Sequence, residues 1–119
     1  MGSFNKEALK TRTKELAIGV ARFTLELPYN VVNENYINQI IRCSSSVGAN
    51  YRAACRAKST ADFINKLKIV EEETDETMYF LELLQVFNPG KENTIQILWK
   101  EANEILSIIV TSLNTLRRN

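Results

Sequence analysis

The sequence predicts an all-α protein, an up-down-up-down four-helix bundle formed by a single domain over residues 1–119. Apolar residues recur at helical spacing in four long segments. The chain has only two prolines and four glycines, and three of these six residues (Pro28, Pro89 and Gly90) stand where segments meet. Short joints make successive helices antiparallel neighbours, which is the arrangement of an up-down bundle.

The first segment is predicted to be helical from about Phe4 to Leu27, where Pro28 ends it. Its buried stripe consists of Leu9, Leu16, Val20, Phe23 and Leu27. The second helix is expected to begin near Asn33, a residue type that caps helices well, and to end at a turn around Lys58. Its stripe consists of Ile37, Ile40, Ile41, Ser44, Val47, Gly48, Tyr51 and Cys55. The small Ser44 and Gly48 would let a neighbouring helix approach closely.

The third helix should begin after Ser59, because Ser59 and Asp62 resemble a capping box. It reaches about Phe87. Its seam consists of Phe63, Leu67, Val70, Thr74, Thr77, Leu81 and Leu84. A fourth helix is predicted from about Glu92 to Leu116. Its stripe consists of Ile95, Leu98, Ala102, Ile105, Ile109, Leu113 and Leu116.

Large apolar residues also lie away from the seam of the third helix, and these are Ile69, Phe80, Leu83 and Phe87. Single exposed apolar side chains are ordinary on protein surfaces. Several large ones on one stripe instead indicate a second buried surface. We therefore expect a homo-oligomer with closed symmetry, in which these four residues form the interface.

The composition argues against catalysis. The chain has no histidine, which removes Ser-His and Cys-His mechanisms, most zinc sites and the di-iron motif of ferritin-like bundles. The carboxylates between Glu71 and Glu76 point around more than half of their helix and do not converge on a metal. We predict that the protein is not an enzyme and uses no cofactor or metal.

The remaining composition indicates a cytoplasmic protein without a membrane segment. Cys43 and Cys55 lie about 18 Å apart in one predicted helix, so we expect them to be reduced and half-buried. No apolar run approaches the roughly 18 residues of a membrane span, and the N-terminus has no signal-peptide pattern.

Basic residues gather in the sequence around the predicted turn between the second and third helices. The net charge of +1 gives no global basic field, so any anion site must come from local segregation of charge. Arg42, Arg52 and Arg56 fall within about 80° of one another on the second helix, and Lys58, Lys66 and Lys68 follow.

These basic residues have two readings. Arginines spaced along a helix can contact successive phosphates, and Asn50 and Tyr51 could add polar or stacking contacts. Alternatively, the acidic run of the third helix could pair with the arginines, within or between subunits. We expect such pairing for Arg42 and Arg52, while Arg56 and Lys58, near the turn, remain free.

The stretch from Ser45 to Leu84 carries the most specific motif and reads SSVGANYRAACRAKSxxDFxxKLxIVEEExDETxYFLELL. It resembles the central motif of the bacterial four-helix-bundle proteins named after the 23S rRNA intervening sequences that encode some of them. The resemblance implies an up-down four-helix bundle that assembles into a ring-like homopentamer. This family in turn resembles the accessory proteins of diversity-generating retroelements, which are basic pentamers that bind nucleic acid and a reverse transcriptase. The chain departs from many relatives, which have Ile-Ala-Glu-Gly in place of Ala49–Arg52, and from the basic accessory proteins in its net charge.

The resemblance and the charge pattern together predict a non-enzymatic oligomer that binds RNA or DNA. The residues predicted to contact phosphates are Arg52, Arg56, Lys58 and Lys66. The alternative is a protein-interaction or scaffold module that binds no nucleic acid, whose apolar stripe and acidic face dock a partner protein.

Overall fold

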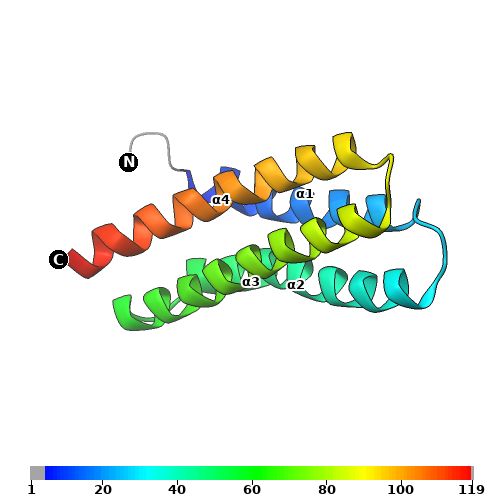
Figure 1. Cartoon of the computed structure of the whole chain (residues 1–119). Helices are drawn as coiled ribbons and strands as arrows, with labels where there is room; N and C mark the ends of the chain where they lie inside the picture. Colours follow the sequence, from blue (N-terminus) through cyan, green and yellow to red (C-terminus); the bar gives the residue numbers. More distant parts are fainter. Residues whose placement is uncertain (1–4, 119) are drawn as a thin grey trace.

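The computed structural model describes residues 5–118 and contains four long helices, α1 (Lys6–Thr24), α2 (Val31–Cys55), α3 (Thr60–Phe87) and α4 (Glu92–Arg118). Successive helices run antiparallel and pack side by side in an elongated bundle of 47 × 23 × 22 Å (Figure 1). The predicted all-α four-helix bundle is therefore confirmed. The predicted start of the first helix at Phe4 lies outside the described residues.

The helix α1 ends at Thr24, about one turn before the predicted end at Leu27. The backbone N–H groups of Glu26 and Leu27 bond to carbonyls three residues earlier, at 3.0 and 3.2 Å, so the last turn is tightened. Pro28 has no N–H group and disfavours a helical conformation of the residue before it. The chain therefore leaves the helix at this point.

The start of α2 differs from the prediction in a way that matters for stability. Asn30 is the cap, since its side-chain oxygen accepts a hydrogen bond of 2.8 Å from the backbone N–H of Asn33. The prediction of Asn33 as the cap was wrong. The Asn33 side chain is buried and exchanges two hydrogen bonds of 2.9 Å with the amide of Asn88, at the end of α3. Asn33 also donates to the carbonyl of Pro28, and Asn88 donates to that of Leu84.

The turn between α2 and α3 is capped much as predicted. Ser59 Oγ accepts a hydrogen bond of 3.1 Å from the N–H of Asp62. The Asp62 carboxylate reaches back to the N–H of Lys58 at 3.4 Å, one residue earlier than in a capping box. The tight turn holds Arg56 and Lys58 at one end of the bundle.

The third connection, from α3 to α4, begins and ends where the sequence predicts. The helix α3 ends at Phe87 and α4 begins at Glu92. Gly90 has a φ of 95°, a conformation that glycine adopts without steric cost. Its N–H donates to the Glu92 carboxylate at 3.0 and 3.1 Å, which fixes the start of the new helix.

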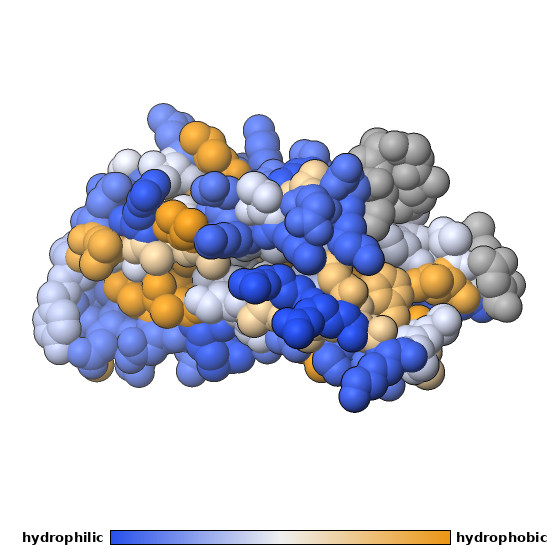
Figure 2. All heavy atoms as spheres, turned by 180° about the vertical axis from the view of Figure 1, so that it is seen from behind, coloured by the Kyte–Doolittle hydropathy of each residue, from blue (hydrophilic) through white to orange (hydrophobic). Residues whose placement is uncertain are grey.

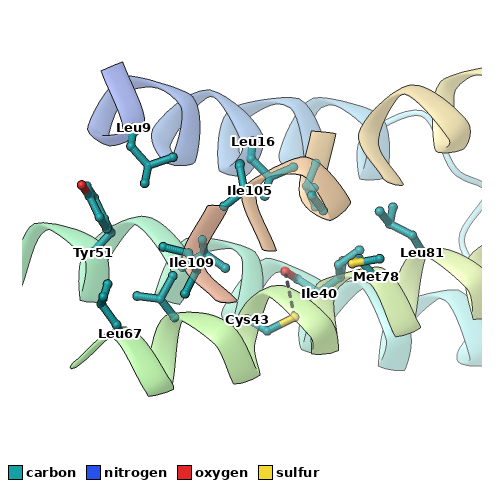
Figure 3. Close-up of a cluster of buried hydrophobic side chains, with 14 of the residues drawn as sticks. Leu9, Leu16, Ile40, Cys43, Tyr51, Leu67, Met78, Leu81, Ile105 and Ile109 are labelled. Carbon is teal, nitrogen blue, oxygen red and sulfur yellow. Dashed lines mark hydrogen bonds between the residues drawn. The ribbon is translucent and has the colours of Figure 1, made fainter. Parts of the chain in front are cut away.

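The four predicted stripes meet in one core, as Figure 3 shows for a cluster of its side chains. Most of the predicted residues are buried, and those at the ends and edges of the stripes are only half-buried. The half-buried residues of the predicted stripes are Leu27, Ile37, Ile41, Cys55, Phe63, Leu98 and Leu116. A Cβ on Gly48 would lie 3.4 Å from Thr13 Oγ1, so α1 and α2 approach closely at the predicted small residue.

The two cysteines differ in burial, although the sequence predicts both to be half-buried. Cys55 is half-buried, but Cys43 is fully buried, and its sulfur accepts a hydrogen bond of 3.4 Å from the Thr77 hydroxyl. Burial raises the pKa of the Cys43 thiol, which lowers the fraction of reactive thiolate.

We expect iodoacetamide to alkylate Cys55 at least about tenfold faster than Cys43 in the folded protein, because the thiolate of Cys43 is both scarce and inaccessible. Mass spectrometry of the digested protein measures the two rates. Urea should bring them together, and equal rates in the native state would contradict the prediction.

Candidate nucleic-acid interface

The α2–α3 turn, the start of α1 and the end of α4 lie at the same end of the bundle (Figure 1). Lys6, Lys58 and Leu116 line one pocket there, so the three regions lie next to one another. We call this end the basic end, and its basic residues with described side chains are Lys6, Lys10, Arg52, Arg56, Lys58, Lys66 and Arg117. Among the described residues, Glu7 and Asp62 are the acidic side chains at this end.

Three of the four predicted phosphate-contacting residues are exposed at the basic end. Arg52 lies in the last turn of α2, Arg56 is the C-terminal cap of that helix and Lys58 lies in the turn. Within residues 5–118, none of the three has a carboxylate partner within 4.0 Å. The expected pairing of Arg52 within the chain is therefore not found, and its guanidinium is available.

The fourth predicted residue, Lys66, is the least available. It is half-buried, and its Nζ lies 3.0 Å from Asp62 Oδ1, one helical turn away. The hydrogen bond from Lys66 holds the pKa of the Asp62 carboxyl below its usual value, and the backbone N–H of Lys58 adds to this. Because an aspartate neutralises it, Lys66 contributes less positive potential than Arg56 or Lys58.

The remaining arginine of the predicted set, Arg42, pairs as expected. It bridges α2 to α3 by contacting Glu76 and, at 3.3 Å, Glu73. These carboxylates raise the pKa of the Arg42 guanidinium, so it stays charged. Arg42 thus serves the α2–α3 contact and is not part of the basic end.

The two residues expected to assist at the phosphates are engaged elsewhere. Tyr51 is 1% exposed and belongs to the core, so it cannot stack on a base. The Asn50 amide donates to the carbonyl and hydroxyl oxygens of Ser46, at 2.9 and 2.8 Å. The expectation of stacking by Tyr51 was wrong.

The sequence reasoning missed the contribution of α1 and α4. Lys6 and Lys10 from α1 and Arg117 from α4 join the basic end only because the fold brings the ends of these helices beside the α2–α3 turn. It also missed Arg12, which forms a bidentate pair with Glu101 at 2.9 and 2.8 Å and contacts Glu104 at 2.9 Å. The three-residue spacing of Glu101 and Glu104 on one face of α4 is the signal that could have indicated this clamp.

Three of the four predicted interface residues lie together on the outer face of α3. Phe87 is 51% exposed, and Phe80 and Leu83 are half-buried. Tyr36 of α2 joins them, with ring centroids 6.1 Å from Phe80 and 5.9 Å from Phe87. Ile69 is exposed as well, but it lies about three helical turns from Phe80. We call Tyr36, Phe80, Leu83 and Phe87 the outer apolar cluster.

The described residues show two further properties of the surface. Within residues 5–118, His, Cys, Asp and Glu side chains nowhere gather in threes as possible metal ligands. None of the described helices has the length and apolar character needed to cross a membrane.

Comparison with known proteins agrees with the motif between Ser45 and Leu84. A family model described as 23S rRNA-intervening sequence protein matches residues 7–111. The crystal structure of a protein of unknown function from the S23 ribosomal protein family of Bacteroides thetaiotaomicron is similar, with 31% identity and a TM-score of 0.78. The similarity covers 88% of this chain and 97% of that one. A search of curated proteins gave no match. The chain belongs to the 23S rRNA-intervening sequence protein family.

Proposed function

We propose that the protein is a non-enzymatic, cytoplasmic homo-oligomer that binds RNA through the basic end. The observation that carries this proposal is the local excess of basic over acidic side chains there, in a chain whose net charge is only +1. Neutralising phosphates and releasing their counterions drives binding that does not depend on sequence. Arg52, Arg56 and Lys58 are the main contacts, and Lys66 has a smaller part.

The oligomer in this proposal is a ring, and a pentamer by family resemblance. Two apolar surfaces support it, one formed by α2 and α3 and the other by α1 and α2. One is the outer apolar cluster, and the other includes the exposed Leu25 and the half-buried Ile18, Ile37 and Ile41 of α1 and α2. Figure 2 shows the face made by α1 and α2, where apolar atoms gather toward the end at which these helices connect. Two different surfaces fit a head-to-tail contact, which can close into a ring.

We expect the double charge reversal Arg56→Glu/Lys58→Glu to weaken binding of a single-stranded RNA at least about tenfold at roughly 0.1 M salt. At this ionic strength the Debye screening length is about 10 Å, so exposed charges still act on nearby phosphates. The double variant should also lower the slope of log affinity against log salt by about 1.4, since each lost phosphate contact removes about 0.7. Fluorescence anisotropy at several salt concentrations measures both quantities.

The matched control is Arg22→Glu/Lys100→Glu, which makes the same change in net charge at exposed positions away from the basic end. It should leave the slope unchanged and the affinity within about threefold of the wild type. The proposal fails if the wild-type protein binds no RNA at low salt, or if the two double variants lose affinity equally.

A second candidate function, a protein-interaction or scaffold module, is favoured by the exposed aromatic surface around Phe87. Under this alternative the outer apolar cluster holds a different protein and the basic residues only keep the chain soluble. A defined complex with a partner protein, lost in Phe87→Glu, together with no RNA binding by the wild type, would favour it.

A further inference from the structure

A groove runs along the outside of the bundle between the first half of α1 and the second half of α2. Its volume is about 570 Å³. The floor is made of small residues, including Ala17, Gly48 and Ala49. The charged residues of the rim are Lys10, Lys14 and one acid, Glu7, on α1, and Arg52 on α2. Of the four residues that the sequence predicts to contact phosphates, Arg52 is the one that lines this groove.

The groove is shallow because α1 and α2 touch at Gly48. A side chain at this position would meet Thr13 of α1, so only a very small residue lets the helices come this close. Ala49 and Ser45 continue the small surface along α2, and both are exposed. An extended polymer could therefore lie close to the helix backbones between two raised rows of side chains.

The charges of the rim favour an anion. Lys14 and Arg52 are exposed, and within residues 5–118 neither has a carboxylate within 4.0 Å. Lys10 is partly neutralised by Glu7, at 3.2 Å. Arg12 on the same helix behaves differently, because Glu101 and Glu104 of α4 hold it and it does not line the groove. Of the cations that line the groove, Lys14 and Arg52 are thus available, and Lys10 is shared with Glu7.

The spacing of these cations matches a repeating ligand. Lys10 and Lys14 are four residues apart on α1, and Arg52 and Arg56 are four residues apart on α2. Four residues correspond to a rise of about 6 Å along each helix. Lys10 and Arg52 also belong to the basic end, so the two rows continue the surface formed by Arg56 and Lys58.

We propose that this groove binds the phosphodiester backbone of RNA and extends the contact surface from Arg56 and Lys58 to Lys10 and Lys14. The inference rests on the proposed function and adds the course that the RNA backbone follows along the bundle. None of the described residues lining the groove is aromatic, so bases have nothing to stack on. Recognition is through phosphates and ribose hydroxyls and carries no preference for base sequence.

The test compares three variants with the wild type, using 20-nucleotide oligouridine and oligoadenosine as probes in fluorescence anisotropy. Lys10→Glu/Lys14→Glu should weaken binding of both probes about tenfold and lower the salt slope by about 1.4. Ala49→Leu fills the floor without changing charge and should weaken binding several-fold. Arg22→Glu/Lys100→Glu changes the charge equally at positions outside the groove and should bind like the wild type.

The outcomes separate the groove from the proposed function. If Lys10→Glu/Lys14→Glu binds like the wild type while Arg56→Glu/Lys58→Glu loses affinity, the groove is not a contact surface but the proposed function stands. If the wild type binds neither probe, both proposals fall. If Lys10→Glu/Lys14→Glu or Ala49→Leu converts an oligomer to a monomer, the groove is an interface between copies and the proposal is overturned. A more than tenfold difference between the two probes would refute recognition through the backbone alone.

Discussion

Asn88→Leu is expected to lower the free energy of unfolding by about 3 kcal/mol, because it leaves the buried amide of Asn33 without its partner. Asn33 is 0% exposed and Asn88 is 4% exposed, so water cannot replace the lost hydrogen bonds. Domains are commonly stable by only about 5–15 kcal/mol, so the loss is a large fraction of the total. Urea unfolding followed by circular dichroism, at one fixed protein concentration, measures it.

The double variant Asn33→Leu/Asn88→Leu should recover part of this loss, since neither amide is then buried without a partner. We expect a coupling energy of about 1–3 kcal/mol between the two positions in a double-mutant cycle. The control is Asn65→Leu, an exposed asparagine of α3, which should change stability by no more than about 0.5 kcal/mol. Additive losses from the two single substitutions would show that the pair is not coupled.

The second large effect concerns self-association. Ile69→Glu/Phe87→Glu is expected to convert the proposed oligomer into a monomer of about 13.6 kDa. Both side chains are exposed in the isolated bundle, so the helices should tolerate the change. A carboxylate buried in an apolar interface without a partner is costly, so the contact between copies should not form. Light scattering coupled to size-exclusion chromatography measures the mass.

Ile97→Glu is the matched control for this prediction. Ile97 is a 70% exposed apolar residue of α4, whereas the four predicted interface residues all lie on α3, so the mass should not change. Circular dichroism should show that all variants keep their helices. A monomeric wild type, or an oligomer that survives Ile69→Glu/Phe87→Glu, would contradict the proposed interface.

The sequence predicted the fold well because helical periodicity places residues on one face whatever the partner helix is. The seam of α3 is the clearest case, since Leu67, Val70 and Leu81 are buried as predicted and Phe63 is half-buried. The turn at Ser59 was equally predictable from the sequence, because capping depends on residues only three apart. Such features are local, and local patterns can be interpreted without knowing what packs against them.

The errors arose where the outcome depends on a distant residue. Asn30 and Asn33 are both suitable caps, and only Asn88, far along the chain, explains why Asn33 is buried instead. The clamp on Arg12 needs Glu101 of α4 in the same way. Part of the basic end was missed for this reason too, because Lys10 becomes a neighbour of Arg52 only when α1 packs on α2.

The separation of charge along the bundle has a kinetic consequence. Two helices start and two end at each end of an up-down bundle, so the backbone dipoles largely cancel and side chains set the dipole moment of the molecule. The end opposite the basic end carries Glu26, Glu34 and Glu92 beside the basic Arg22 and Lys91, so the excess of positive charge is confined to the basic end. The molecule is nearly neutral overall and 47 Å long, but its charge is separated between its two ends. The field of an approaching polyanion should therefore orient the molecule before contact. Added salt should then slow association more than it speeds dissociation.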